Sequence, residues 1–351
     1  MKQLTCLGPG RLEWLEIREP EVEEPDDVLV RPIVVARCEI DPLLATAGPT
    51  RGPQFALGHE AVAQVVAVGD DVSHVVAGDL VVPSFQLSCG RCTTCRRGRS
   101  AVCDAYPTLS DYGMEPLSGM EYGGMLSDLV RVPHASTMLA PVPQGISPLA
   151  LASAADNLLD GYRAVAPHLT RRPGSTIAVV CHGLRSIGLY AAHAAVALGA
   201  SDVAVVTVDG DVAAAADGLG ARMVVPDFGQ RPLERWPIVV DCGTDVGALQ
   251  WAIRATEPEG VFQSVSSYLE GSVPLPLGRL YTLGIELHIG RVHSASGVAE
   301  VVAAIEAGVL MPLSVPTDVV PWDQAAERFL QPGIKVIFDR SSTPDLDVTI
   351  A

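Results

Sequence analysis

The stretch Cys89-Gly90-Arg91-Cys92-Thr93-Thr94-Cys95, closed by Cys103, decides how this chain is organised. Four thiols at the spacing C-x2-C-x2-C-x7-C can converge on one tetrahedral ion, and Zn²⁺ is the usual occupant of such a site. Two disulfides, or four separate thiols, are the alternative. Clustered C-x2-C pairs in a chain without a secretion signal favour the metal. A site closed by four thiolates is structural, so chemistry must lie elsewhere.

The composition describes an ordinary folded protein. The chain has 351 residues, of which 48% are hydrophobic and 19% charged, and this length is enough for two domains. The net charge of -17 argues against a nucleic acid or an anionic membrane as a partner, because it would repel phosphate. We therefore expect a small-molecule substrate.

The chain carries no visible targeting segment. Residues 1–10 contain no continuous apolar region of a signal peptide, and no uninterrupted apolar run reaches membrane-spanning length. We expect a cytoplasmic protein. In a reducing cytoplasm, the three cysteines outside the metal candidates, Cys6, Cys181 and Cys242, are expected to be buried thiols.

The first 150 residues read as a β-rich, barrel-like domain. Short β-branched runs at 28–36, 61–68 and 79–83 are separated by Pro and Gly and predict strands. Gly69 and Gly78 stand where tight turns are expected.

A second metal site is predicted within this half. Cys38, His59 in Gly58-His59-Glu60, and Asp156 offer a thiolate, an imidazole and a carboxylate, a set of three ligands that leaves one position open for water or substrate. Taken singly these signals are weak. His59 could be a turn or core residue, and Asp156 could cap the following helix.

The order of the motifs is specific. Cys38, Gly58-His59-Glu60-Ala61, the four-cysteine lobe, Asp156 with Asp160-Gly161-Tyr162, and a Gly-bearing βαβ unit follow one another. This order resembles the zinc-dependent alcohol dehydrogenases of the medium-chain dehydrogenase/reductase superfamily, over essentially the whole chain. The resemblance implies an α/β protein with a GroES-like β-rich catalytic domain (1–156 and 290–351, with the zinc lobe at about 86–105) and a Rossmann doubly wound parallel-sheet domain (157–289).

The resemblance also implies roles for the metal residues. Cys38 and His59 match the first two ligands of a catalytic zinc, and Asp156 stands where the third ligand is Cys in many members and Asp in others. Glu60 matches a carboxylate that can approach the metal, and Asp41 one that orients the ligand His. The structural zinc lobe is matched by Cys89, Cys92, Cys95 and Cys103. Two zinc ions per chain are therefore expected.

The second half predicts a dinucleotide fold. Strands at 176–180, 203–208 and 238–242 alternate with helices from about Leu184 to Leu198 and from Ala213, a pattern typical of a parallel sheet with helices on both faces. The turn after the first strand should present backbone N–H groups to a pyrophosphate. It reads Cys181-His-Gly183-Leu-Arg185-Ser186-Ile-Gly188, with Arg185 in place of the central glycine and a loop about two residues longer than the family's.

The type of nicotinamide cofactor, NAD or NADP, stays open. The residue expected to bind the adenosine ribose is Thr207 rather than an acid, with Asp209 two residues on, so the NAD pattern is missing. No cation follows to hold a 2′-phosphate. Arg185 could pair with a phosphate, and Lys335 matches a family position that approaches the pyrophosphate. A solvated surface charge is the alternative for each.

Two readings of the reaction compete. In the family, zinc acts as a Lewis acid on the substrate oxygen and hydride passes to the nicotinamide. Here Ile40 replaces the hydroxyl that relays the proton, Glu39 replaces a cationic or small residue, and Asp160 replaces a Thr near the nicotinamide. We favour an oxidoreductase with altered proton handling that acts on an alcohol, a carbonyl, or a polarised C=N or C=C bond.

The alternative is a non-redox zinc enzyme, a lyase, hydrolase or cyclase in which Glu39, Glu60 or Asp160 is the acid/base. A binding protein that kept only the fold is the third candidate. The family also implies a homodimer or homotetramer, joined through the Rossmann sheet edge near Leu280 to Ile289.

Overall fold

The computed structural model describes residues 1–50, 52–115, 122–268 and 272–341 and divides into two compact units. The first comprises residues 1–159, 293–307 and the chain from 317 onward; the second comprises residues 160–292 and 308–316. The second unit thus starts and ends its main segment three residues later than the predicted 157 and 289. Segment 308–316, which we had assigned to the first domain, lies with the second, where the N–H of Met311 donates to Nε2 of His193 over 2.8 Å.

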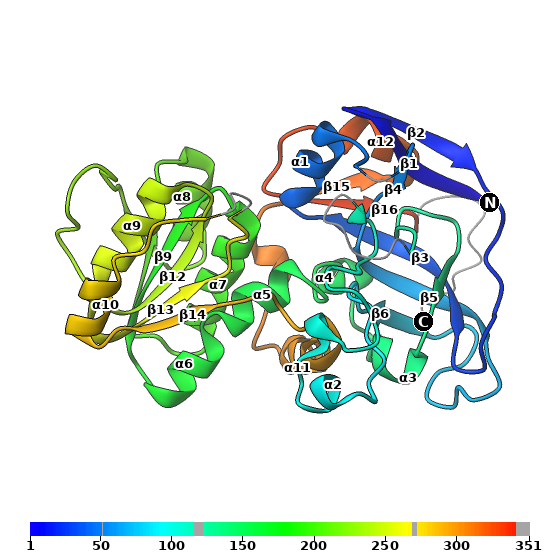
Figure 1. Ribbon diagram of the computed structural model, residues 1–351, viewed down its shortest axis with the longest axis horizontal. Helices are drawn as coiled ribbons and strands as arrows, with labels where there is room; N and C mark the ends of the chain where they lie inside the picture. Colours follow the sequence, from blue (N-terminus) through cyan, green and yellow to red (C-terminus); the bar gives the residue numbers. More distant parts are fainter. Residues whose placement is uncertain (51, 116–121, 269–271, 342–351) are drawn as a thin grey trace. The chain divides into compact units, whose positions relative to one another are not determined.

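The first unit is built on two sheets (Figure 1). The larger has seven strands in the order β15-β16-β3-β5-β6-β8, with β7 paired to β3. Its strands are β3 (Val28–Arg37), β5 (Glu60–Val68), β6 (Leu80–Pro83), β7 (Val130–Val132), β8 (Leu139–Pro141), β15 (Thr317–Pro321) and β16 (Lys335–Asp339). The smaller sheet holds β1 (Lys2–Gly8), β2 (Arg11–Glu16) and β4 (Phe55–Ala56).

Short helices complete the first unit. They are α1 (Ile40–Ala47), α2 (Thr93–Arg96), α3 (Ala135–Met138), α4 (Pro148–Leu151), α11 (Ser294–Glu306), α12 (Ala325–Arg328) and the 3₁₀ turns η1 (Ser100–Val102) and η4 (Trp322–Gln324). The predicted strands in this half are confirmed, and Gly78 adopts a φ of +100° at its turn.

The second unit contains one six-stranded sheet in which all neighbours are parallel. Its order is β11-β10-β9-β12-β13-β14, which in chain order is the 3-2-1-4-5-6 arrangement of a Rossmann fold. The strands are β9 (Thr176–His182), β10 (Asp202–Val206), β11 (Arg222–Val224), β12 (Trp236–Gly243), β13 (Thr256–Ser264) and β14 (Glu286–Ile289). The predicted fold class, a β-rich domain plus a Rossmann domain, is confirmed.

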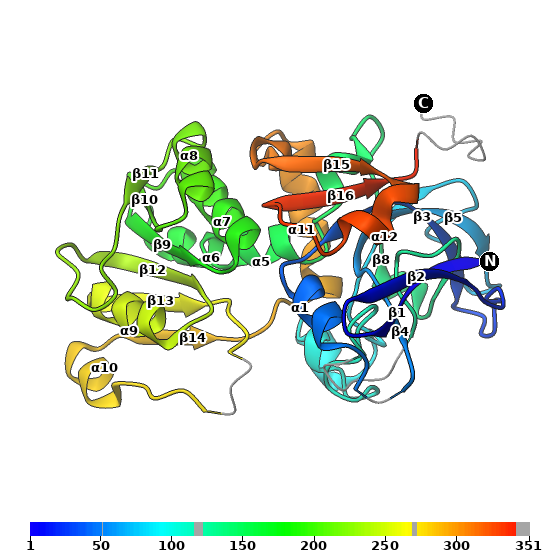
Figure 2. The ribbon, with the colours of Figure 1, turned by 90° about the horizontal axis from the view of Figure 1, so that it is seen from above.

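Helices cover both faces of this sheet. Figure 2 shows α7 (Arg185–Ala197) and α8 (Gly210–Gly218) on one face and α9 (Val246–Ala255) and α10 (Leu277–Leu283) on the other. The remaining elements are α5 (Asn157–Arg163), α6 (Ala166–Arg171) and η3 (Pro312–Ser314). Strands buried on both faces need continuous apolar runs, which is why β9 and β12 read as Ile-Ala-Val-Val and Ile-Val-Val. Cys181 and Cys242 are buried there and Cys6 in β1, as expected.

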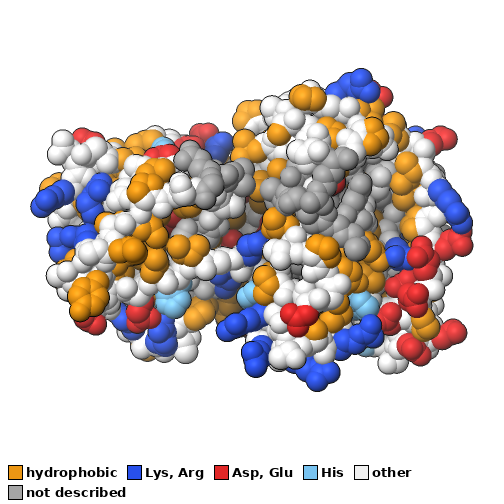
Figure 3. All heavy atoms as spheres, in the orientation of Figure 1, with side chains coloured by type: hydrophobic (Ala, Val, Ile, Leu, Met, Phe, Trp, Pro, Cys, Tyr) orange, Lys and Arg blue, Asp and Glu red, His pale blue; other side chains and the backbone are white. Residues whose placement is uncertain are grey.

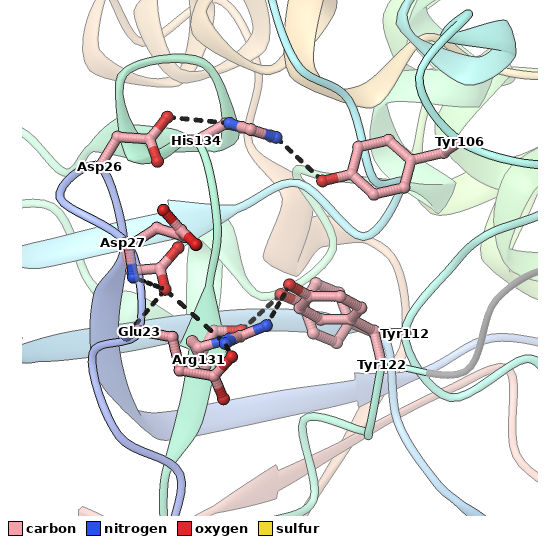
Figure 4. A network of polar contacts seen from close by, with 9 residues as sticks. Glu23, Asp26, Asp27, Tyr106, Tyr112, Tyr122, Arg131 and His134 are labelled. Atoms are coloured by element: carbon pink, nitrogen blue, oxygen red, sulfur yellow. Dashed lines mark hydrogen bonds and ion pairs between the residues drawn. The ribbon is translucent and has the colours of Figure 1, made fainter.

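A polar network fastens β7 to the loop before β3 (Figure 4). Arg131 pairs with Glu23 and lies over the Tyr122 ring, 5.2 Å from its centroid. His134 lies 2.8 Å from Asp26 through Nδ1 and 2.9 Å from the Tyr106 hydroxyl through Nε2. These contacts hold the acidic loop 17–27 against the rest of the first unit. Among the residues that the structure describes, no helix has the length and apolar character needed to cross a membrane.

Candidate metal centre and dinucleotide turn

Four buried side chains of the first unit form a candidate metal centre. One ligand atom from each of Cys38, His59, Glu60 and Asp156 lies within 4.8 Å of all the others, as required of atoms that share an ion at bond lengths of about 2.0–2.3 Å. A thiol, an imidazole and two carboxylates without water are costly to bury unless a cation balances them. The donor set therefore fits Zn²⁺.

Strand pairing brings the first ligands together. β3 and β5 are antiparallel, and Ala36 lies opposite Glu60, so Cys38, just beyond β3, and His59, just before β5, meet at one end of the sheet. Gly58 precedes His59 with a φ of +87°, and a Cβ there would lie only 3.0 Å from the Leu126 nitrogen. Only glycine fits this approach. Asp156 reaches the same point from the turn between α4 and α5.

Asp41 contacts two of the candidate ligands. Its Oδ2 accepts the N–H of Cys38 over 3.0 Å, and its Oδ1 lies 3.1 Å from Nδ1 of His59. The other ring nitrogen, Nε2, lies 3.1 Å from Oδ2 of Asp156. A ligand His is usually oriented through its second nitrogen in this way.

Glu60 has both carboxylate oxygens engaged. Oε1 lies 2.6 Å from Nζ of Lys335, with both side chains fully buried. Oε2 accepts the N–H of Asn157 over 3.3 Å. Lys335, which we predicted to approach a cofactor phosphate, is thus placed in an internal ion pair within the first unit.

Burial and charge perturb the ionisation of this cluster. Burial raises the pKa of the Cys38 thiol, and Asp156 adds to the increase. Burial raises the pKa of Glu60 to about 7, against the opposing effect of Lys335. For His59 burial alone would lower the pKa, but Asp41 and Asp156 outweigh it and the pKa is raised. Such concentrated perturbation is typical of a functional site.

The four-cysteine lobe forms a second centre. Sulfur atoms of Cys89, Cys92, Cys95 and Cys103 lie within 4.8 Å of one another, and all eight cysteines of the chain are free thiols. Backbone N–H groups point at the sulfurs: that of Cys95 donates to Cys92 over 3.3 Å and that of Cys89 to Cys103 over 3.4 Å. Such bonds, from Cys95 and Asp104, lower the pKa of Cys92 to about 7. For Cys92 they favour the thiolate, the form that binds zinc, whereas burial raises the pKa values of Cys95 and Cys103.

The lobe is also a basic patch on an acidic chain. Arg91, Arg96, Arg97 and Arg99 are exposed around α2, whereas the β2–β3 loop exposes Glu19, Glu21, Glu23 and Glu24. Figure 3 shows one group of Lys and Arg side chains at the lower edge of the view and one group of Asp and Glu side chains at the lower right, with both types mixed elsewhere.

The dinucleotide turn of the second unit keeps its two outer glycines. A Cβ on Gly188 would lie 2.6 Å from the Cys181 sulfur, so glycine lets α7 pack closely on β9. Gly183 has a φ of +123°. A cavity of about 350 Å³ opens here, lined by Cys181, His182, Gly183, Arg185, Val208 and Asp209. It lies beyond the carboxyl ends of β9 and β10, where a Rossmann fold binds its ligand.

The centre of this turn departs from a phosphate cradle. Arg185 extends toward Asp209, 3.5 Å away, and the N–H of Leu184 donates to the carbonyl of Cys242 over 3.1 Å. Asp209 caps α8 through its other oxygen, and its own N–H donates to the Thr207 hydroxyl. Ser186 is buried in the first turn of α7.

Two predicted acid/base candidates have partners of their own. Glu39 accepts a hydrogen bond from the amide of Asn157 over 2.9 Å. Asp160 belongs to the second unit and pairs with Arg163 over 2.5 Å. Ile40 begins α1 and offers no hydroxyl.

Sequence reasoning missed three functional candidates. Asn157 links Glu39 and Glu60. Arg37 is buried, and its guanidinium donates to the carbonyls of Phe329, Gln331 and Gly333. Asp241 is buried in β12 and accepts from the hydroxyls of Ser264 (2.8 Å) and Tyr268 (3.0 Å). A charged residue directly beside an apolar run was the available signal for Arg37, Asp241 and Lys335.

Comparisons with known proteins agree on one family. The family model of the alcohol dehydrogenase GroES-like domain matches residues 24–144. A protein named probable zinc-binding alcohol dehydrogenase, from Mycobacterium tuberculosis, is 28% identical over 336 residues, 94% of this chain and 84% of the relative. An NADP-dependent isopropanol dehydrogenase from Entamoeba histolytica is 33% identical over 209 residues, 58% of this chain and 53% of the relative.

A solved alcohol dehydrogenase structure is similar to this chain over nearly its full length. The alcohol dehydrogenase from Thermus sp. ATN1 superposes with a TM-score of 0.88 at 26% identity, over 97% of this chain and 99% of that one. Its match spans both units described above. The family model, the relatives and the solved structure all indicate the zinc-dependent alcohol dehydrogenases of the medium-chain dehydrogenase/reductase superfamily, a family of oxidoreductases to which this chain is similar over nearly its full length.

Proposed function

We propose that this protein is a zinc-dependent oxidoreductase that moves a hydride between a nicotinamide dinucleotide and an alcohol/carbonyl pair, or a related polarised C=N or C=C substrate. The observation that carries the proposal is the buried set of Cys38, His59 and Asp156, with ligand atoms close enough to share one ion. When bound, zinc supplies a Lewis acid to the substrate oxygen, and the nicotinamide ring accepts or donates the hydride.

The residues of the first unit have defined tasks. Cys38, His59 and Asp156 hold the metal, and Asp41 fixes the ring of His59 and the backbone of Cys38. Three ligands leave a position for substrate. The second metal, in the lobe of Cys89, Cys92, Cys95 and Cys103, stabilises the fold.

The second unit would bind the dinucleotide. The first turn of α7 offers N–H groups and a positive helix terminus to the pyrophosphate, and Arg185 supplies a cation that can turn from Asp209 toward a phosphate. The similarity to an NADP-dependent isopropanol dehydrogenase supports a nicotinamide cofactor. The residues around Thr207 and Asp209 would determine whether NAD or NADP is bound.

A non-redox zinc enzyme is the second candidate. Arg185 at the centre of the turn, and the Leu184 N–H already donated to Cys242, favour it, because both reduce the cradle offered to a pyrophosphate. Glu39 would then serve as acid/base, held by the amide of Asn157.

Fluorescence titration with NADH and NADPH separates the candidates. Binding of one dinucleotide, two zinc ions per chain by metal analysis, and alcohol-dependent formation of reduced nicotinamide support the oxidoreductase. If neither dinucleotide binds at about millimolar concentration while both zinc ions are present, the non-redox candidate replaces it. One zinc ion or none would overturn the metal assignment for both.

The assembly and location form part of the proposal. Within the described part of the chain β14 is an edge strand, and Ile289 at its end and Tyr281 in the preceding α10 are exposed, so two copies could join through this edge into a homodimer or into half of a homotetramer. Eight free cysteines suit a reducing cytoplasm. Sedimentation of the purified protein measures the oligomeric state.

A further inference from the structure

Glu60 is close enough to the other ligands to close the metal centre. Its carboxylate belongs to the group whose ligand atoms all lie within 4.8 Å of one another, and the side chain is fully buried. With Glu60 bound, Cys38, His59 and Asp156 would complete a four-coordinate set. A closed set is that of a structural site, whereas catalysis needs an open position.

Two donors compete with the metal for Glu60. The ammonium group of Lys335 lies 2.6 Å from Oε1, and the N–H of Asn157 donates to Oε2. Lys335 and Glu60 are both inaccessible to solvent, so neither charge can be satisfied by water if the pair separates. If Glu60 moved onto the metal, the buried ammonium group of Lys335 would lose this carboxylate partner, which is unfavourable inside the protein.

Lys335 itself is held in place by the segment before it. It is the first residue of β16, whose next residue, Val336, lies opposite Arg37 of β3. The guanidinium of Arg37 donates to three carbonyls between 329 and 333. Arg37 directly precedes the ligand Cys38, so the segment leading to Lys335 is tied to the strand end that carries the metal ligand.

We propose that Lys335 is a positioning residue that competes with the metal for the carboxylate of Glu60 and thereby keeps one coordination position open for substrate. This inference rests on the metal site of the proposed function. It assigns Lys335 a task at the metal in place of the contact with cofactor phosphate that the sequence had suggested. Arg37 supports Lys335 by fixing the segment 329–333.

Cobalt substitution tests this directly, because the visible spectrum of Co²⁺ reports its ligands. The four-cysteine site is closed, so any spectral change on adding imidazole reports the Cys38 site. In the unaltered protein, imidazole should bind and shift the spectrum. In Lys335→Met, which keeps the length of the side chain without its charge, Glu60 should occupy the open position. Imidazole binding should weaken at least about tenfold, a free-energy change of about 1.4 kcal/mol.

Two further variants give the control. Lys335→Arg keeps the cation and should bind imidazole as the unaltered protein does. The double variant Lys335→Met with Glu60→Gln removes the competing ligand and should recover imidazole binding. If Lys335→Met is too unstable to purify, Arg37→Lys, which loses the forked contact with the 329–333 carbonyls, should show a smaller weakening in the same direction.

The outcomes separate this inference from the proposed function. An imidazole response in Lys335→Met equal to that of the unaltered protein, or a loss that Glu60→Gln does not reverse, overturns the role of Lys335 alone. Failure of any Co²⁺ to bind at Cys38, His59 and Asp156 overturns the metal site and with it the proposed function.

Discussion

The metal centre of the first unit and the dinucleotide turn of the second differ in how fully they keep the family's chemistry. At the metal centre every expected ligand is present and buried, and Asp41 contacts two of them. At the turn the outer glycines remain, but Arg185 stands at the centre and pairs with Asp209. The comparison teaches that activation of the substrate by metal is the better supported half of the reaction.

Replacing a ligand should separate chemistry from folding. His59→Ala removes an imidazole ligand and should lower activity by at least about a thousandfold, beyond the 10–100-fold typical of residues behind a ligand. The bound zinc should fall from two ions to one. Steady-state kinetics measure the activity, metal analysis measures the zinc content, and circular dichroism checks the fold, which should be retained. Equal zinc content in the variant would contradict the assignment.

Replacing a lobe cysteine should have the opposite profile. Cys92→Ser removes one thiolate of the structural site, and because such sites contribute folding energy directly, we expect the midpoint of thermal unfolding to fall by at least about 5 °C. Calorimetry measures it. Should His59→Ala unfold at the same lowered temperature, the distinction between a catalytic and a structural metal would be lost.

The charge beside Arg185 should set the choice of cofactor. Asp209→Asn keeps the cap on α8, since Asn is as good a capping residue, but removes a carboxylate that would repel a 2′-phosphate. Binding of NADPH should improve about tenfold relative to NADH. Parallel fluorescence titrations measure the ratio. An unchanged ratio would show that Asp209 does not face the adenosine ribose.

A pH-dependent effect on stability is expected at Asp241. Burial raises the pKa of this carboxyl to about 6, against the hydrogen bonds from Ser264 and Tyr268. The protonated form is therefore favoured by folding. The stabilisation that comes from this preference is fully present below the unfolded pKa of about 3.9. As the pH rises through about 6 it is lost, and the free energy of unfolding falls by roughly 2–3 kcal/mol.

The matched control is Asp241→Asn, which has no carboxyl at this position. Its free energy of unfolding should not show the fall between low pH and neutral pH that is expected of the unaltered protein. Urea unfolding at several pH values between about 4 and 7 measures it as the difference in free energy of unfolding between the two proteins. A difference that stays constant across this range would mean that Asp241 does not titrate with folding.

Local spacing made part of this molecule predictable. The lobe of Cys89 and Cys92 follows from C-x2-C alone, and the strands around β9 follow from unbroken apolar runs. The neighbours of Glu60 could not be predicted from local spacing, because Lys335 is separated from it by 275 residues and Asn157 contributes a backbone N–H. No sequence pattern reports which strand will be paired beside β3, or which backbone donor will face a carboxylate.

The same limit applies to Arg37 and Arg185. A cation in a sequence reads as a surface charge, yet Arg37 is buried against three carbonyls and Arg185 is engaged with an acid from the next helix. Segment 308–316 lies with the second unit rather than with the predicted first domain, and its contact between Met311 and His193 is one that composition does not reveal.

The first unit is interrupted in the chain by the second, and this has a consequence for synthesis on the ribosome. The nascent chain presents Cys38, His59 and Asp156 before β16, which pairs with β3 and carries the ammonium group opposite Glu60, 275 residues further along the chain. An ion captured during translation would therefore meet Glu60 before its restraint exists. β16 would have to enter the sheet before Lys335 could restrain that carboxylate, so the proposed role of Lys335 makes the emergence of β16 the step that matures the centre.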